Sequence, residues 1–545
     1  MKHFFPRIFK ALEDTPLSLL TASTTFLGLI ITRLIIEGSL GSFEPHSFSY
    51  LFFEFSHTFL FFLCSFLLFL PIVQLAGKEN LKKSTNVLLF GFLLILTPPI
   101  IDKIIFQDQA FWSFYEFDGL IGLVQRYFTL FGDTPSIGIT YGVRVEVVLV
   151  TLALGFYAFI KQKKLLTALG ISLLSYTVLF VLGTFPSWLT LILLAFQKSL
   201  LAISAPDVAA IFLSPEAILG RELPDLRAVL NIKMSLFYAC FTILLSGALL
   251  FHFAKEHFIA LLKNARIPQL VYHGGLLTLG MALALTFTDT SLSFSSPFTF
   301  LAYILLIAAV ECAWLASVVV NDIFDVAIDE KTNSFRPLIQ KTIPKDQFMT
   351  YGALFFFASL LFAGLVSFQA LLLLLAYQAI AWLYSAPPLR LKRFLGIATL
   401  LAGCAGILVL CAGFLAVAPE TGILTLPPAL LFFLLVGYTL SLPIKDFKDV
   451  TGDAADNVYT LPVVVGIQNA KWILGSLFFI LYALSPFILH ETALFFPALL
   501  FGSLSFWTLQ KANEKESSFF AFRKLPIPLL MLIGVYGICI FFFLR

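Results

Sequence analysis

Long apolar runs recur along almost the whole of this 545-residue chain, and they restrict its fold more than any other feature. Many of them approach the roughly 20 residues that a helix needs to cross a bilayer. Only 12% of the residues are charged, which is about half the share in a soluble domain and too few to cover a water-facing surface. The strict alternation of a β-barrel is missing. The sequence therefore predicts an all-α polytopic membrane protein.

We expect fifteen spans, six in the first half of the chain and nine in the second. The six lie at roughly 17–36, 50–75, 86–104, 144–161, 165–184 and 232–254. The nine lie at roughly 268–288, 298–320, 349–367, 369–386, 397–417, 427–444, 471–489, 493–510 and 525–544. We interpret a further apolar stretch, 187–204, as re-entrant or interfacial, because a crossing there would invert every later span.

The basic loop residues support this count through the positive-inside rule. Lysines and arginines gather after the second, fourth and sixth spans and before the last one, so all of them fall on one side of the membrane. We expect that side to be the cytoplasm, with the N-terminus on it. The net charge of +3 is small and no dense basic patch is present, so we expect no nucleic-acid partner.

A charged, amphipathic segment at 255–268 is expected to join two domains. We expect a multi-span membrane domain of unknown function over 1–256 and a second domain over 257–545. The first half carries no metal motif, phosphate loop or nucleophile signature. Its ionisable residues at membrane depth either pair with one another or line a polar site, and they are Arg33, Glu54, His57, Arg144 and Glu146.

Two acidic clusters with the same spacing mark the second half of the chain. In both, carboxylates stand at i, i+3 and i+7, which would place them on one face of a helix. Each cluster follows an apolar span, and both emerge on the expected cytoplasmic side. The first cluster contains Asn321, Asp322, Asp325 and Asp329, and the second contains Asp446, Asp449 and Asp453.

Like charges this close repel one another, so we expect a cation between them. Ligand sets made only of oxygen suit Mg²⁺, which bridges carboxylates to phosphate oxygens. Two facing clusters therefore indicate Mg²⁺ ions with a diphosphate as the bridging ligand, held as a leaving group. The alternative is a pair of acidic helix ends in ordinary loops, and the matched spacing counts against it.

Three ordered motifs resemble those of the UbiA superfamily of intramembrane prenyltransferases, over about residues 262–545. The Asn-Asp-x-x-Asp-x-x-x-Asp pattern from Asn321, with Arg336-Pro337-Leu338 downstream, is similar to the first signature. The stretch from Lys445 to Asp453, which continues to Thr460-Leu461-Pro462, resembles the other aspartate-rich signature. The segment Tyr384 to Arg393 is similar to the tyrosine/lysine loop between them.

The resemblance implies a nine-helix transmembrane bundle, here preceded by a separate bundle of about six helices. It also implies Mg²⁺-dependent transfer of a prenyl group from an isoprenyl diphosphate to a hydrophobic acceptor. The acceptor is left open among an aromatic or quinone precursor, a chlorin and a lipid. Phosphoribosyl transfer to a polyprenyl phosphate on the same fold is an alternative, since it needs the same diphosphate site.

Basic residues between the clusters are candidates to bind the diphosphate. Arg390 and Lys392 follow two prolines that end a helix, and in the chemistry above they would clamp phosphate, with Tyr384 shielding a carbocation. An ordinary positive-inside anchor is the competing interpretation. Further candidates for substrate binding are Arg336, Lys445, Lys448 and Arg393.

Glu311 lies inside a span, eleven residues before Asp322. An ionisable group at membrane depth is functional by default, so Glu311 is a candidate to orient or deprotonate the acceptor. An interhelical hydrogen bond would explain it as well. A cation-coupled lipid transporter is the alternative from another class of protein, but transport sites lie near the bilayer midplane, whereas the two clusters lie at helix ends.

Overall fold

The computed structural model describes residues 4–40, 48–105, 115–132, 138–222, 226–290, 292, 296–394, 396–455, 458–515 and 518–543. Apart from two isolated bridges, all regular structure in these stretches is helical, as predicted. The chain divides into two compact units. The first unit is Met1–Ala217 with Glu222–Phe258, and the second is Ile218–Arg221 with Ile259–Arg545.

Fourteen helical segments among the described residues are long and apolar enough to cross a membrane. Those of the first unit are α2 (Leu19–Leu40), α3 (Phe48–Gly77), α4 to α5 (Leu81–Ile105), α7 (Tyr141–Gln162), α8 (Leu165–Gly183) and α11 (Leu226–Phe253). Those of the second unit are α13 (Ile267–Phe287), α14 (Pro297–Phe324), α16 (Lys345–Val366), α17 (Phe368–Ser385), α18 (Ile397–Val417), α19 with η5 (Pro428–Lys448), α22 (Ile467–Ile488) and η6 with α23 (Thr492–Lys511). The shorter α24 (Pro526–Phe543) corresponds to the last expected span. The chain is a multi-pass integral membrane protein.

The apolar stretch at 187–204 does not form a span. Its helix α9 (Phe185–Leu194) has 10 residues, and at 1.5 Å per residue it covers only about half of the hydrocarbon core. A 3₁₀ turn, η2 (Leu200–Ala202), and the short α10 (Ala205–Phe212) follow it. This geometry agrees with the re-entrant or interfacial interpretation.

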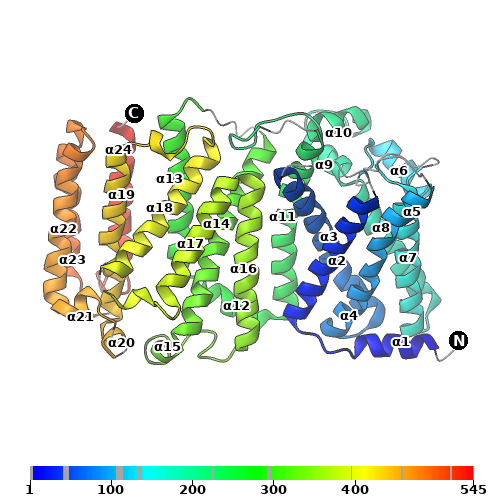
Figure 1. Ribbon diagram of the computed structural model, residues 1–545, viewed down its shortest axis with the longest axis horizontal. Helices are drawn as coiled ribbons and strands as arrows, with labels where there is room; N and C mark the ends of the chain where they lie inside the picture. The colour runs from blue at the N-terminus through cyan, green and yellow to red at the C-terminus, as the bar shows by residue number, and fades with distance from the viewer. Residues whose placement is uncertain are drawn as a thin grey trace. The chain divides into compact units, whose positions relative to one another are not determined.

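In the first unit, α1 (Phe4–Glu13) lies across one end of the spans (Figure 1). The Tyr157 hydroxyl donates to Glu13 Oε1 at 2.8 Å, and Lys161 Nζ lies 2.6 Å from Glu79 Oε1. Lys161 Nζ also lies 2.9 Å from Glu13. These contacts bring the N-terminal helix, the turn after α3 and the end of α7 together at one end of the unit. The positive-inside rule placed these three segments on the same side of the membrane.

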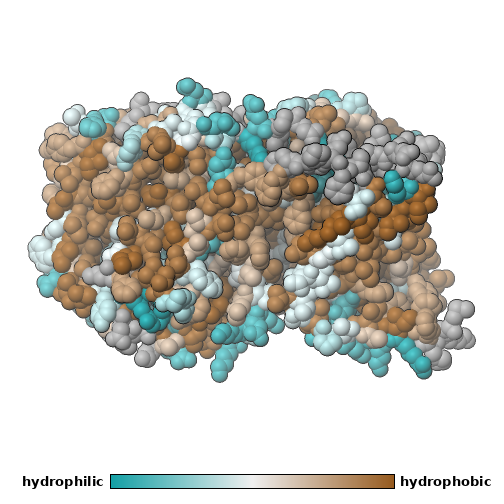
Figure 2. All heavy atoms as spheres, in the orientation of Figure 1, coloured by the Kyte–Doolittle hydropathy of each residue, from teal (hydrophilic) through white to brown (hydrophobic). Residues whose placement is uncertain are grey.

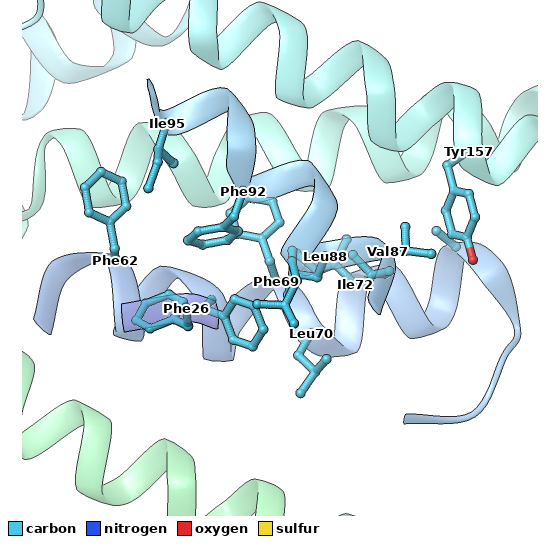
Figure 3. Close-up of a cluster of buried hydrophobic side chains, with 14 of the residues drawn as sticks. Phe26, Phe62, Phe69, Leu70, Ile72, Val87, Leu88, Phe92, Ile95 and Tyr157 are labelled. Carbon is cyan, nitrogen blue, oxygen red and sulfur yellow. The ribbon is translucent and has the colours of Figure 1, made fainter. Parts of the chain in front are cut away.

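The core of the first unit is a cluster of buried aliphatic and aromatic side chains (Figure 3). Phe26, Phe66 and Phe92 pack there with ring centroids 5.3 Å (26 to 66), 5.7 Å (26 to 92) and 5.1 Å (66 to 92) apart. Aromatic pairs in such tilted or edge-on arrangements add roughly 0.5–1.5 kcal/mol each beyond the area that they bury. They hold α2 and α3 against the 3₁₀ segment η1 (Phe92–Leu96).

Two polar side chains of α3 find separate partners. Glu54 accepts from Arg227 Nη2 at 2.6 Å and from Asn231 Nδ2 at 3.0 Å, which ties α3 to α11. His57 Nε2 lies 2.7 Å from the Tyr115 hydroxyl. The contacts of Glu54 and His57 therefore favour structural pairing over a lipid or proton site at these two positions.

In the second unit, α14 packs against α16 and α17, α13 against α18, and α22 against α23. Side chains along the middle of the spans are mostly hydrophobic, and hydrophilic residues gather toward the ends (Figure 2). Large apolar side chains such as Phe496, which is 81% exposed, point outward. A surface of this kind is suited to lipid and not to water.

Glycines set the close approach of α13 and α18. A Cβ on Gly280 would lie 1.9 Å from the Leu410 carbonyl oxygen, and a Cβ on Gly413 would lie 2.0 Å from the Leu277 carbonyl oxygen. Because these obstacles are backbone atoms, a side chain at either glycine forces the helices apart. Small residues at such an interface are the usual way for helices to pack closely in a membrane.

We expect Gly413→Ala to lower the free energy of unfolding by about 1–3 kcal/mol, as overpacking does elsewhere. Gly275→Ala is the matched control, because a Cβ there meets nothing within 4 Å. Denaturation of both variants in micelles measures the difference. Equal stabilities would show that α13 and α18 do not pack as closely as described.

Candidate active site

Each acidic cluster lies at a break between two helices. Asp325 separates the end of α14 from α15 (Val326–Thr332), with φ −108° and ψ 13°. Asp449 separates η5 (Leu442–Lys448) from α20 (Val450–Ala455), with φ −110° and ψ 6°. The expectation that each cluster lies along one continuous helical face is therefore wrong, because the chain changes helix at the middle aspartate. Both aspartates occupy the bridge region of backbone space, where many active-site residues lie.

The two breaks also share their hydrogen bonds. Asp329 N–H donates to Asp325 O at 2.8 Å, and Asp453 N–H donates to Asp449 O at 2.9 Å, so each middle aspartate starts a short helix. α15 and α20 are in contact, and both lie at the lower end of the second unit in Figure 1. The structure thus places the two clusters next to each other.

Asp322 is held by polar side chains on both of its oxygens. Asn264 Nδ2 donates to Oδ2 at 2.6 Å, and Arg266 Nη2 donates to Oδ1 at 3.2 Å. Arg336 Nη1 donates to Asn264 Oδ1 at 2.7 Å and lies 3.6 Å from Asp322 Oδ1. The Asp322 side chain is 1% exposed. Its negative charge is therefore compensated by these protein contacts and not by solvent.

The basic loop reaches the middle of the first cluster. Arg390 Nη2 donates to Asp325 Oδ1 at 3.0 Å, and Lys392 Nζ makes a close ion pair with the same carboxylate. Burial lowers the pKa of Lys392, and the charge of Asp325 opposes this effect. The charge of Lys392 also acts on Asp453 of the second cluster. The loop between the motifs therefore lies within range of both clusters.

The outer aspartates are short of positive charge. Burial raises the pKa of Asp329 to about 6, although Arg336 opposes the shift. Burial, followed by the charge of Asp449, raises the pKa of Asp453 to about 6. Asp329 Oδ2 is buried and makes no hydrogen bond among the described residues. Both carboxylates would be stabilised by an added cation.

The described carboxylates do not already form a closed metal cage. Within the parts of the chain that the structure covers, no three His, Cys, Asp or Glu side chains converge as ligands of one ion. Cations of the protein lie among them instead, with Arg390 and Lys392 on Asp325. Asn321 Oδ1 accepts from Ser385 Oγ at 3.3 Å.

The remaining basic candidates are spread more widely. Lys445 Nζ lies 6.0 Å from the ring centroid of Tyr384, within range of a cation–π contact. Lys448 lies 3.6 Å from Asp449 Oδ2, and both are part-exposed. Arg393 is exposed, and the structure does not bring it to a carboxylate among the described residues. Beside the second cluster lies a cavity of about 530 Å³, which Lys448 lines together with Arg523 and Lys524.

Glu311 lies deep in α14 against α13. Gly274 of α13 lies beside its carboxylate, since a Cβ there would be 3.5 Å from Glu311 Oε1, while Oε2 is buried without a hydrogen bond among the described residues. His273 and Tyr377 lie in the same region, with His273 Nε2 3.2 Å from the Tyr377 hydroxyl. The charge of Glu311 acts on Tyr377. A polar patch therefore exists at membrane depth, away from the two clusters.

Sequence reasoning missed Asn264 and Arg266, which bind Asp322. They stand in the charged segment that we expected to serve only as a joint between domains. The only signal was a polar and basic pair immediately before a span, which an ordinary cytoplasmic flank also shows. It could not be interpreted without knowing that the start of α13 lies beside the end of α14.

Together these features define a multi-pass membrane protein with a buried, mixed-charge centre at one end of its second unit. Residues 275–525 match the UbiA prenyltransferase family. The C-terminal half of this chain is a prenyltransferase domain of the UbiA family. The motif resemblance noted in the sequence is thereby confirmed.

Individual relatives are distant. Digeranylgeranylglyceryl phosphate synthase of Thermococcus sibiricus is 26% identical over 39% of this chain and 74% of its own length. The chloroplastic chlorophyll synthase of Arabidopsis thaliana is 30% identical over 28% of this chain and 41% of its own length. The solved structure of a UbiA homolog from Archaeoglobus fulgidus bound to GPP and Mg²⁺ is 18% identical, covers 52% of this chain and 99% of that chain, and has a TM-score of 0.41.

Proposed function

We propose that the second unit transfers a prenyl group from an isoprenyl diphosphate to an acceptor in the membrane, with Mg²⁺ between the two acidic clusters. The observation that carries this proposal is the contact of α15 with α20, which sets the clusters side by side, with Arg390 and Lys392 paired to Asp325 of the first cluster. The binding of GPP and Mg²⁺ by the Archaeoglobus homolog supports it.

The oxygen atoms present fit Mg²⁺. Asn321, Asp325 and Asp329 would hold metal on one side, and the second cluster, Asp446, Asp449 and Asp453, would hold it on the other. Oxygen ligands are what this ion prefers. Bound there, Mg²⁺ would neutralise the diphosphate and stabilise it as it leaves. Asp322 was expected to be a ligand as well, but its contacts with Asn264 and Arg266 favour a positioning role.

The chain's own cations complete the diphosphate site. Arg390 and Lys392, which pair with Asp325 here, would bind the phosphate oxygens of the donor if that carboxylate held Mg²⁺. Arg390 offers a planar guanidinium and Lys392 a point charge. Their interactions with the phosphate oxygens become stronger as negative charge develops on the leaving group. Lys445, Lys448 and Arg336 lie in reach of the same clusters, whereas exposed Arg393 is the weakest candidate. Tyr384 offers its ring face to positive charge on the prenyl carbon.

Glu311 is assigned to the acceptor. It precedes Asp322 by eleven residues, which is about 16 Å along a helix at 1.5 Å per residue. This separation is too large for Glu311 to take a proton from an atom that reacts beside the diphosphate. We therefore propose that Glu311 orients the acceptor by binding a polar group on it, and not that it deprotonates the reacting atom.

We expect Glu311→Gln to raise KM for the acceptor about 10-fold, the effect of one weakened hydrogen bond to a charged group, with kcat nearly unchanged. Glu420→Gln, in an exposed loop of the same unit, is the matched control. Steady-state kinetics with donor held saturating gives both constants. A loss confined to kcat would instead place Glu311 in the chemical step.

We also propose that the site faces the cytoplasm. The positive-inside count supports this side, because the clusters leave their spans where the basic loops gather. Labelling of an introduced cysteine by a membrane-impermeant thiol reagent in sealed, inside-out vesicles tests it. Protection there, with labelling in right-side-out vesicles, would reverse the assignment.

Mass spectrometry of lipids from membranes with and without the protein tests the proposed activity itself. A new species heavier than a membrane component by one prenyl group is the expected result, and its identity names the acceptor. A polyprenyl phosphate that has gained a sugar phosphate would point to phosphoribosyl transfer. Lipid movement without any covalent product would overturn the proposal in favour of a transporter.

A further inference from the structure

A cavity of about 130 Å³ lies inside the first unit, among α2, α3, α4, η1, α7 and α8. Nearly all of the side chains that line it are apolar. Five of them are phenylalanines, namely Phe61, Phe62, Phe69, Phe92 and Phe131, of which Figure 3 shows Phe62, Phe69 and Phe92. A cavity of roughly 150 Å³ lined by apolar groups accommodates benzene. The volume here is therefore close to that of one aromatic ring.

Arg33 of α2 is the first of two charged residues in the wall, and it is 3% exposed. Its Nη1 donates to the Ile95 carbonyl at 2.5 Å. That carbonyl is available because Pro99, four residues later, has no N–H to donate to it. Arg33 Nε makes no hydrogen bond among the described residues and lies 3.8 Å from Glu37 Oε2. Since a guanidinium carries five N–H donors, Arg33 is held in place with donors to spare.

Glu146 of α7 is the second charged residue in the wall. The charge of Arg33 acts on it, but no hydrogen bond or ion pair joins its carboxylate to another residue in the described part of the chain. A carboxylate at membrane depth without a partner indicates a binding role. With Glu37 beside Arg33, the carboxylates outnumber the cation, so an anionic ligand would be repelled. A neutral group that both donates and accepts would satisfy Glu146 and Arg33 together.

We propose that this cavity binds a neutral hydroxylated aromatic ring, the phenol-like head of a membrane lipid, with its hydroxyl between Arg33 and Glu146. The hydroxyl donates to the Glu146 carboxylate and accepts from the Arg33 guanidinium. The ring faces pack against the phenylalanines, and an attached apolar chain can leave between the helices into lipid. The site belongs to the first unit alone and does not depend on the prenyl-transfer proposal.

Photolabelling of the full-length protein in nanodiscs tests the ligand class. The probe is a 4-alkylphenol that carries a diazirine on its chain, and labelled peptides are mapped by mass spectrometry. We expect labels on α3 and α7 of the first unit. Unlabelled 4-alkylphenol should compete about 10-fold better than the alkylbenzene of equal length, since only the phenol makes hydrogen bonds to the charged pair. An alkyl phosphate should compete least.

Two substitutions and one control test whether the probe binds in this cavity. Gly91 lines the cavity, has an ordinary helical backbone, and a Cβ on it would meet nothing within 4 Å, so Gly91→Leu fills the space. Gly170→Leu is the matched control, because its Cβ is equally free and it lies outside the cavity wall. Glu146→Leu removes the acceptor for the hydroxyl.

Labelling of the first unit should fall about 10-fold or more in Gly91→Leu and in Glu146→Leu, and stay unchanged in Gly170→Leu. Thermal unfolding verifies the fold of each variant, and if Gly91→Leu does not fold, Glu146→Leu and the competitor series decide. Labelling that persists in Glu146→Leu would overturn the proposal. Equal competition by alkylphenol, alkylbenzene and alkyl phosphate would overturn it as well.

Discussion

Replacing Asp449 by Asn is expected to slow Mg²⁺-dependent release of diphosphate from a prenyl donor by about 10²–10³-fold, the usual effect of losing one electrostatic contact to the transition state. Asparagine keeps the shape of the side chain but removes the charge that would hold the metal. The fold should survive, because Asp449 is 32% exposed and its pair with Lys448 is 3.6 Å long. A surface pair of this kind contributes at most about 1 kcal/mol. Single-turnover release at several Mg²⁺ concentrations gives the rate.

Asp346→Asn is the matched control for this substitution. Asp346 lies exposed in the first turn of α16 and makes no hydrogen bond or ion pair with either cluster among the described residues, so its variant should keep full activity. Asp325→Asn should lose at least as much activity as Asp449→Asn, and it also leaves Arg390 and Lys392 without their counter-charge. Full activity in both cluster variants would rule out the proposed role of the carboxylates.

Arg336→Met is expected to lower the free energy of unfolding by about 3–5 kcal/mol, the usual cost of removing one partner from a buried charge network. Arg336 Nη1 donates to Asn264 Oδ1, and the guanidinium lies 3.6 Å from Asp322 and 3.8 Å from Asp329. Both carboxylates are nearly inaccessible to solvent. Without Arg336 their charges face each other across a buried site with less compensation.

Denaturation of the purified protein in micelles measures this loss. Arg393→Met is the matched control in the same unit, since Arg393 is exposed and exposed substitutions usually stay within about 0.5 kcal/mol. The double variant Arg336→Met with Asp322→Asn should recover part of the loss, because it removes one stranded charge. If Arg336→Met were as stable as the wild type but inactive, Arg336 would bind substrate and not hold the cluster.

Most of the fold follows from the sequence. A span is a local property, set by about 20 apolar residues, so each of the expected crossings reappears as a helix or as a run of consecutive helical segments. The helix ends follow local chemistry as well: Ser385 ends α17 just before Pro387 and Pro388, as the two prolines require. The sequence also predicts correctly that 187–204 is not a crossing. An additional crossing there would move the basic loops of all later spans to the opposite side of the membrane.

The site was only partly predictable. Spacing identified the carboxylates but not the backbone, since i, i+3, i+7 fits both one continuous helix and the observed pair of helices joined at Asp325 or Asp449. The contacts between side chains of different spans could not be predicted either. That Asn264 binds Asp322, or that Lys392 lies on Asp325, depends on which spans are neighbours. One sequence does not carry that information.

The first unit illustrates the same limit. Glu54 and His57 stand three residues apart and were candidates either to pair or to line a polar site, yet each bonds to a different distant residue. Glu146 belongs to no motif, and the sequence left it between pairing and a polar site; the cavity that it shares with Arg33 favours the polar site. The sequence marked these residues as unusual for a membrane span. Their partners decide what they do.

The measurement that tests the central claim most directly is binding of an unreactive prenyl thiodiphosphate to the full-length protein in nanodiscs, with and without Mg²⁺. If the donor is held by metal between the acidic clusters, binding should require Mg²⁺ and should be lost in Asp449→Asn but kept in Asp346→Asn. Affinity that is the same without Mg²⁺, or the same in Asp449→Asn, would contradict the account.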